Sequence, residues 1–145
     1  LDDLGLLPTL RSMTAEFAER SGITVEFRAP DGLPPLSEET ELAIFRALQE
    51  ALANVARHTA ARVVQVEVVS AGGWLSLDVI DDGPGFGAVD LERLEQEGHM
   101  GLVGMRERIA TLGGKLRLSR GERGARIHID VTLLPRAGAA PTESR

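Results

Sequence analysis

The chain has no cysteine and no tyrosine, and it has one tryptophan among 145 residues. The lack of cysteine excludes disulfides and thiolate metal sites and leaves the cellular compartment open. Because only four phenylalanines accompany the tryptophan, the core must be built from Leu, Val, Ile and Ala. The length fits one domain with one hydrophobic core.

Excess positive charge and long apolar runs are also lacking. The 22 acidic residues outnumber the 16 lysines and arginines, and the formal net charge is −6. A chain without a basic stripe is a poor candidate for nucleic-acid binding. No apolar run approaches the roughly 20 residues that span a bilayer, so we expect no direct membrane contact in this segment. Because Leu1 is not a natural start, we expect an excised fragment whose parent could carry an anchor upstream.

The hydrophobic pattern predicts an α+β domain. Helical spacing indicates helices over 8–21, 37–58 and 102–112, and alternation indicates strands over 23–27, 63–69, 74–80, 116–119 and 126–133. A short helix near 91–96 and a disordered tail from residue 135 are further predictions. Because the hairpins are segregated, we expect a mixed sheet with its helices packed on one face.

The predicted helix 37–58 has two faces. Its apolar face, expected to bury against the sheet, consists of Leu42, Ile44, Phe45, Leu48, Leu52 and Val55. The opposite face carries Glu50, Asn54, Arg57 and His58. A merely solvated surface is one interpretation, since any amphipathic helix has a polar face. The other is a phosphate and metal site, because Asn and Glu oxygens suit Mg²⁺ and its waters, and Arg and His can donate to phosphate.

A glycine run follows the strand that leads to Asp81. Gly83, Gly85 and Gly87 alternate along it, and Phe86 stands between the last two. Glycine lets the backbone turn sharply and lets a flat ligand approach closely. A carboxylate at the strand end can accept a hydrogen bond from an exocyclic amine such as that of adenine. An ordinary Asp-Gly turn is the alternative, although it needs one glycine rather than three. Rossmann, P-loop and protein-kinase motifs fit less well.

A second glycine cluster opens the helix predicted over 102–112. It consists of Gly101, Leu102, Val103, Gly104 and Met105. Free backbone N–H groups at a helix start bind anions well. Close packing of the second glycine against the sheet is the alternative. The stretch between the two glycine clusters could act as a lid over a nucleotide.

In this order, the three clusters resemble the ATPase family shared by histidine kinases, DNA gyrase, Hsp90 and MutL. Residues 50–58 look like the N box of the histidine-kinase branch, and residues 81–86 look like its first glycine box. Residues 101–108 are similar to the second glycine box of its nitrate-sensor-like subfamily. The resemblance implies a two-layer α/β sandwich, the Bergerat ATP-binding fold. It also implies a linker over 1–8, an ATP-binding catalytic domain over 9–135 and a tail over 136–145.

The resemblance assigns ATP and Mg²⁺ as ligands. Asn54 would ligate Mg²⁺, and Glu50 would support a metal-bound water and carry the catalytic role. Arg57 and His58 would face the phosphates, which residues 101–105 would wrap. Asp81 would read the adenine amine.

Two further groups of positions complete this comparison with the family. The pocket around adenine would be shaped by Gly83, Gly85, Phe86 and Gly87. Arg57 departs from the family because a lysine is usual there, which keeps the charge and changes the geometry. Ala125 stands where a threonine is usual, so a hydroxyl near adenine would be missing.

The family transfers the γ-phosphoryl group of ATP to a histidine on a separate dimerisation and phosphoacceptor segment, and a response regulator acts downstream. None of the three histidines, His58, His99 and His128, stands in the sequence context of such an acceptor. We therefore expect the ATP-holding half of a cytoplasmic kinase whose parent could be anchored in the inner membrane. We expect His128 to be an outward-facing strand residue. A serine/threonine kinase of the same superfamily and a non-catalytic nucleotide sensor, which Ala125 favours, remain alternatives.

Overall fold

The computed structural model describes residues 5–58, 61–83, 100–120 and 124–133. Its elements are α1 (Leu6–Ser21), β1 (Thr24–Arg28), α2 (Glu38–His58), β2 (Val63–Ala71), β3 (Trp74–Asp81), α4 (Met100–Thr111), β4 (Lys115–Arg120) and β5 (Ala125–Thr132). The sheet has the order β1-β2-β3-β5-β4. β1 runs parallel to β2, and the other neighbours are antiparallel.

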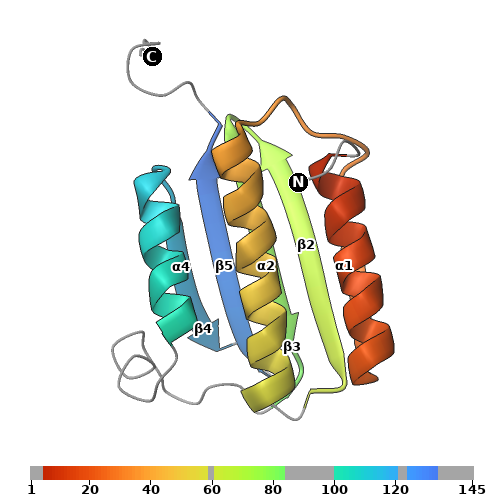
Figure 1. Cartoon of the computed structure of the whole chain (residues 1–145). Coiled ribbons are helices and arrows are strands. Elements are labelled where there is room, and N and C mark those ends of the chain that lie inside the picture. Colours follow the sequence, from red (N-terminus) through yellow and green to blue (C-terminus); the bar gives the residue numbers. More distant parts are fainter. Residues whose placement is uncertain (1–4, 59–60, 84–99, 121–123, 134–145) are drawn as a thin grey trace.

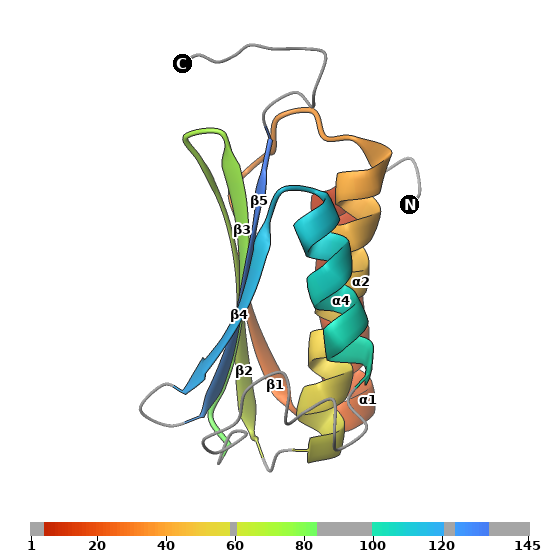
Figure 2. The same cartoon turned by 90° about the vertical axis from the view of Figure 1, so that its left-hand side faces the viewer.

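The labelled helices all cover one face of the sheet (Figures 1 and 2). The chain is therefore a two-layer α/β sandwich with a mixed, mostly antiparallel sheet, as the sequence predicts. The short helix predicted near 91–96 and the tail from residue 135 lie outside the described residues.

Local sequence explains where the helices begin and end. The Ser37 hydroxyl accepts the Thr40 N–H at 3.0 Å, which caps α2. Three glutamates in its first turn complement the helix dipole. α1 ends because Gly22 adopts φ 77° and donates its N–H to the Ala18 carbonyl. α1 begins at Leu6, two residues ahead of the helical start predicted at Pro8, and Leu6 is only 3% exposed.

The core lies between the helices and the inner face of the sheet. Alternate residues of the central strands are buried there: Val64, Val66, Val68, Leu75, Leu77, Val79, Ile127, Ile129 and Val131. The sheet-facing stripe of α2 includes Ile44, Leu48 and Val55. The prediction that Leu42 and Phe45 bury against the sheet is wrong, since Leu42 is 41% exposed and Phe45 is only partly buried. At roughly 100° per residue, Leu42 lies on the far side of the helix from Ile44.

The other face of the sheet carries a polar network. Asp78 Oδ1 accepts a hydrogen bond from Arg126 Nε at 2.8 Å and lies 2.9 Å from His128 Nδ1. His128 Nε2 lies 3.3 Å from Asp130 Oδ2. The His128 side chain is 23% exposed on the face away from the helices, which confirms the prediction that it faces outward. Burial alone would raise the pKa of Asp78, but the hydrogen bonds from Arg126 and His128 outweigh it and lower that pKa.

Replacing Asp78 with alanine should lower the free energy of unfolding by about 1–3 kcal/mol, because two donors lose their shared acceptor. Since the pKa of Asp78 is lowered in the folded state, its ionised form stabilises the fold above the ordinary value of 3.8. This contribution is lost as the pH falls through the folded pKa. The difference in unfolding free energy between wild type and Asp78→Ala, measured in urea, should therefore be smaller at about pH 3 than at about pH 7. An equal difference at both pH values would contradict this assignment.

Candidate nucleotide-binding site

The three sequence clusters come together at one end of the sandwich. Figure 1 shows the C-terminal end of α2, the C-terminal end of β3 and the N-terminal end of α4 at the lower end of the molecule. The end of α2 carries Asn54 and Arg57, β3 ends at Asp81, and α4 begins at Met100. Residues from three distant parts of the chain thus meet at one edge.

Asp81 is a buried carboxylate held by backbone donors. It is 4% exposed, and its Oδ1 accepts the Gly83 N–H at 2.9 Å. The backbone N–H of Ala125, at the start of the neighbouring strand β5, also bonds to this side chain. Burial raises the pKa of Asp81, and the hydrogen bonds from Gly83 and Ala125 only partly oppose that rise. The carboxylate is therefore fixed in direction and poorly solvated, which suits the recognition of a single donor group.

Gly124 makes this arrangement possible, and sequence reasoning did not assign it a role. A Cβ atom at this position would overlap the Asp81 carbonyl oxygen and would lie 2.7 Å from Asp81 Oδ1. Only glycine therefore lets the start of β5 approach Asp81 so closely. The available sequence signal was a glycine at the end of the turn predicted over 121–124.

The polar residues of α2 form a connected group. Asn54 Nδ2 donates to the Glu50 carbonyl oxygen at 2.9 Å and to Glu50 Oε2 at 3.0 Å. Arg57 Nη2 lies 3.5 Å from the same carboxylate oxygen. Asn54 is only 1% exposed, so the interpretation of this face as a merely solvated surface is wrong at that position. Burying an amide is costly unless it is hydrogen-bonded, and Glu50 supplies that bond.

The oxygen atoms of Asn54 and Glu50 fit a magnesium site that is completed by other ligands. Mg²⁺ takes oxygen ligands, keeps several waters and is commonly bound through one or two side chains plus phosphates. Among the residues that the structure describes, no group of three or more His, Asp or Glu side chains could hold a metal alone. Asn54 and Glu50 would supply part of the coordination sphere of such a metal, and waters and phosphate oxygens would supply the rest.

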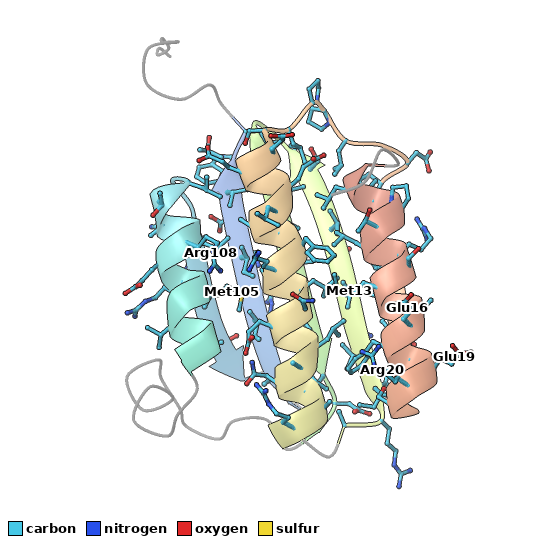
Figure 3. All side chains as sticks on the ribbon, viewed as in Figure 1. Met13, Glu16, Glu19, Arg20, Met105 and Arg108 are labelled. Atoms are coloured by element: carbon cyan, nitrogen blue, oxygen red, sulfur yellow. The ribbon has the colours of Figure 1, made fainter. Side chains whose placement is uncertain are left out.

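The start of α4 contributes backbone rather than side chains. Val103 is 7% exposed and Met105 is 1% exposed, and Figure 3 shows Met105 in the space between α4 and α2. Their side chains belong to the core, so any contact with phosphate would have to use N–H groups of the first turn. No described atom lies within 4 Å of where a Cβ of Gly104 would stand, so packing against the described part of the sheet does not explain that glycine.

Several predicted site residues cannot be placed. Gly85, Phe86 and Gly87 lie outside the described residues, as do the side chains of His58 and Leu102. Gly101 is described only as a position in the first turn of α4.

A groove of about 590 Å³ runs between α1 and α2, lined by residues that include Met13, Glu16 and Arg20 (Figure 3). None of the predicted nucleotide-site residues lines it. The groove is therefore separate from the site at the end of the sandwich. In the described part of the chain, no helix is both long and apolar enough to cross a membrane.

Comparison with known families agrees with this geometry. Residues 39–135 match the model of the histidine kinase-, DNA gyrase B- and HSP90-like ATPases, and the chain belongs to this family. Its place within the family is the ATP-binding catalytic domain of sensor histidine kinases. The matched region contains residues 50–58, 81–86 and 101–108, which resemble the N box and the two glycine boxes of the family.

Individual relatives are sensor kinases. The chain is 39% identical over 116 residues to the signal transduction histidine-protein kinase/phosphatase DegS of Brevibacillus brevis, covering 80% of this chain and 29% of that protein. It is 32% identical over 133 residues to the sensor histidine kinase NarS of Mycobacterium tuberculosis, covering 92% of this chain and 31% of that protein. The chain thus spans about a third of the length of these relatives.

A solved structure has the same fold. The blue-light activated histidine kinase of Erythrobacter litoralis EL346 superposes with a TM-score of 0.71 at 26% identity. The match covers 88% of this chain and 42% of that one.

Proposed function

We propose that the domain binds Mg-ATP at the end of the sandwich where α2, β3 and α4 meet. The observation that carries this proposal is the buried carboxylate of Asp81, oriented by the N–H groups of Gly83 and Ala125. In this pocket the ionised carboxylate accepts a hydrogen bond from the exocyclic amine of adenine. The glycine run 83–87 then borders the base.

The phosphates extend from Asp81 toward α2 and α4. Asn54 and Glu50 hold the magnesium, the latter through water, and the metal neutralises charge on the phosphate oxygens. Arg57 is 58% exposed, so its guanidinium can turn from Glu50 to phosphate. His58 and the first-turn N–H groups of α4, over residues 101–105, complete the phosphate contacts. Phosphoryl transfer depends mainly on such positioning and charge stabilisation.

In the parent protein, the γ-phosphoryl group passes to a histidine on a dimerisation and phosphoacceptor segment, and from there a response regulator is phosphorylated. Residues 1–8 lead from that segment into the first turn of α1, residues 9–135 hold ATP, and residues 136–145 form a tail. The relatives named as sensor histidine kinases support this proposal. The reaction takes place in the cytoplasm, where ATP is available.

Calorimetric titration with ATP, with and without Mg²⁺, tests the site. Asn54→Ala should weaken Mg-ATP binding by about tenfold or more and change binding of metal-free ATP far less, because Asn54 acts through the metal. Gln49→Ala is the matched control, since it removes an exposed amide from the same helix. If Asn54→Ala and Gln49→Ala bind Mg-ATP with equal affinity, the metal assignment is wrong.

Phosphoryl transfer needs a second experiment. The domain alone should turn over ATP slowly, and adding the acceptor helices of the parent protein should yield a phosphohistidine on those helices. A serine or threonine phosphate, or no transfer to any acceptor, would contradict the proposed reaction.

A further inference from the structure

Asp82 makes a double backbone contact outside the buried site. Its Oδ1 accepts the N–H of Arg62 at 2.8 Å and the N–H of Val63 at 3.0 Å. Its own N–H donates to the Val63 carbonyl oxygen at 3.2 Å. The Asp82 side chain is exposed, so these hydrogen bonds, and not packing in the core, hold it in place. One carboxylate oxygen thus fixes the first residues of β2.

The neighbouring aspartates tie the same loop to two different strands. Asp81 bonds to Ala125 at the start of β5, on one side of β3. Asp82 bonds to Arg62 and Val63 at the start of β2, on the other side. The last regular pair of the β2–β3 ladder is Val64 with Asp81, so the Asp82 side chain continues the connection where the ladder stops.

The segment that Asp82 holds leads directly from α2. Arg62 follows the last residue of α2 by four positions, and its carbonyl oxygen accepts the Thr24 N–H at 2.9 Å. The end of α2 carries Asn54 and Arg57. Asp82 therefore fixes Arg62 and Val63, which follow the end of α2 in the chain, relative to the loop that carries Asp81.

We infer that Asp82 is a positioning residue for the nucleotide, acting by holding the end of α2 in register with the Asp81 loop. This inference rests on the proposed ATP site. ATP spans both halves of that site, and a misplacement of about 1 Å is enough to weaken a two-part contact strongly. Adenosine touches only the Asp81 half, which keeps its own bonds to Gly83 and Ala125.

The test compares ATP and adenosine binding to wild type, Asp82→Ala and Asp82→Asn, with Asp31→Ala as the control. Asp31 is an exposed aspartate in the loop between β1 and α2, so its variant loses the same charge away from the site. Asp82→Ala should bind ATP about tenfold more weakly and adenosine within about threefold of wild type. Asp82→Asn, which retains an acceptor oxygen, should bind ATP within about threefold of wild type. Asp31→Ala should match wild type.

Other outcomes overturn the inference in distinguishable ways. If wild type and Asp31→Ala bind ATP but Asp82→Ala binds it equally well, Asp82 has no positioning role and the proposed function stands. If ATP and adenosine weaken alike, the effect is a general loosening of the domain. If the asparagine variant is as impaired as the alanine variant, the acceptor geometry is not what matters. If wild type itself does not bind ATP, the proposed function fails together with the inference. Should Asp82→Ala not fold, Asp82→Leu, which likewise lacks an acceptor oxygen, takes its place with the same expectations.

Discussion

Asp81→Asn should weaken ATP binding by about 30- to 100-fold, the loss expected when a hydrogen bond to a buried charged group is removed. Asparagine can still accept the Gly83 N–H, but its amide group then turns N–H donors toward Ala125 N–H or toward the adenine amine. Both contacts set donor against donor. Calorimetric titration at neutral pH measures the effect, and a loss below about threefold would contradict the role of Asp81.

The same carboxylate predicts how binding depends on pH. Burial raises the pKa of Asp81 above the ordinary 3.8, and only the ionised form accepts the adenine amine. ATP affinity of the wild type should therefore fall on acidification with a midpoint above 3.8, whereas Asp81→Asn should lack this transition. The affinity is measured at a series of pH values from about pH 8 downward, and the two proteins are compared at each.

The free energy of unfolding of the nucleotide-free domain should depend on pH in the opposite sense to ATP affinity. A folded-state pKa that is raised stabilises the fold below 3.8, and this contribution is lost as the pH rises through the folded pKa. Asp81→Asn has no ionisable group at this position, so its unfolding free energy should lack this pH dependence, and the stability of wild type relative to the variant should fall as the pH rises. ATP titration of the variant below its urea and thermal transitions separates a loss of affinity from unfolding.

Gly124→Ala should impair both folding and binding. The added methyl would overlap the Asp81 carbonyl oxygen and crowd its carboxylate, so the start of β5 or the end of β3 must move. We expect a loss of about 2–3 kcal/mol in the free energy of unfolding and at least about tenfold weaker ATP binding, because the Asp81 carboxylate is displaced. Urea unfolding and titration well below the melting temperature measure the two effects separately.

Gly114→Ala is the matched control for that prediction. Gly114 lies between α4 and β4, and a Cβ at this position would overlap the carbonyl oxygen of Asp130 in β5. The steric conflict is of the same kind but lies away from Asp81, so stability should fall similarly while ATP affinity stays within about threefold of wild type. Equal loss of ATP affinity in both variants would show that Gly124 acts through general stability and not through Asp81.

The sequence predicted the fold well because local signals agree with one another. The strands show a clear alternation of apolar and polar residues. Hydrogen bonds between residues close in the sequence mark the start of α2 at Ser37 and the end of α1 at Gly22. The predicted burial of Leu42 failed because Leu42 was grouped with Ile44 although about 100° per residue places the two on opposite sides of the helix. Only packing against the sheet decides that Ile44 is buried and Leu42 is exposed.

Parts of the site depend on contacts between distant segments and could not be predicted. Gly124 matters because β5 approaches Asp81, and Asp82 matters because β2 starts beside it. Both contacts join residues that lie far apart in the sequence; Arg62 and Asp82, for example, are 20 positions apart. Asn54 was assigned to a polar face, and its burial became evident only in the folded chain.

Competition between ATP and GTP tests the central claim most directly. Guanine presents a carbonyl oxygen where adenine presents its amine, so in the proposed pocket it would set an acceptor against the buried Asp81 carboxylate. We predict that ATP binds and that GTP binds at least about 30-fold more weakly, a preference that Asp81→Asn reduces or abolishes. Equal affinity of the wild-type domain for ATP and GTP would contradict the account.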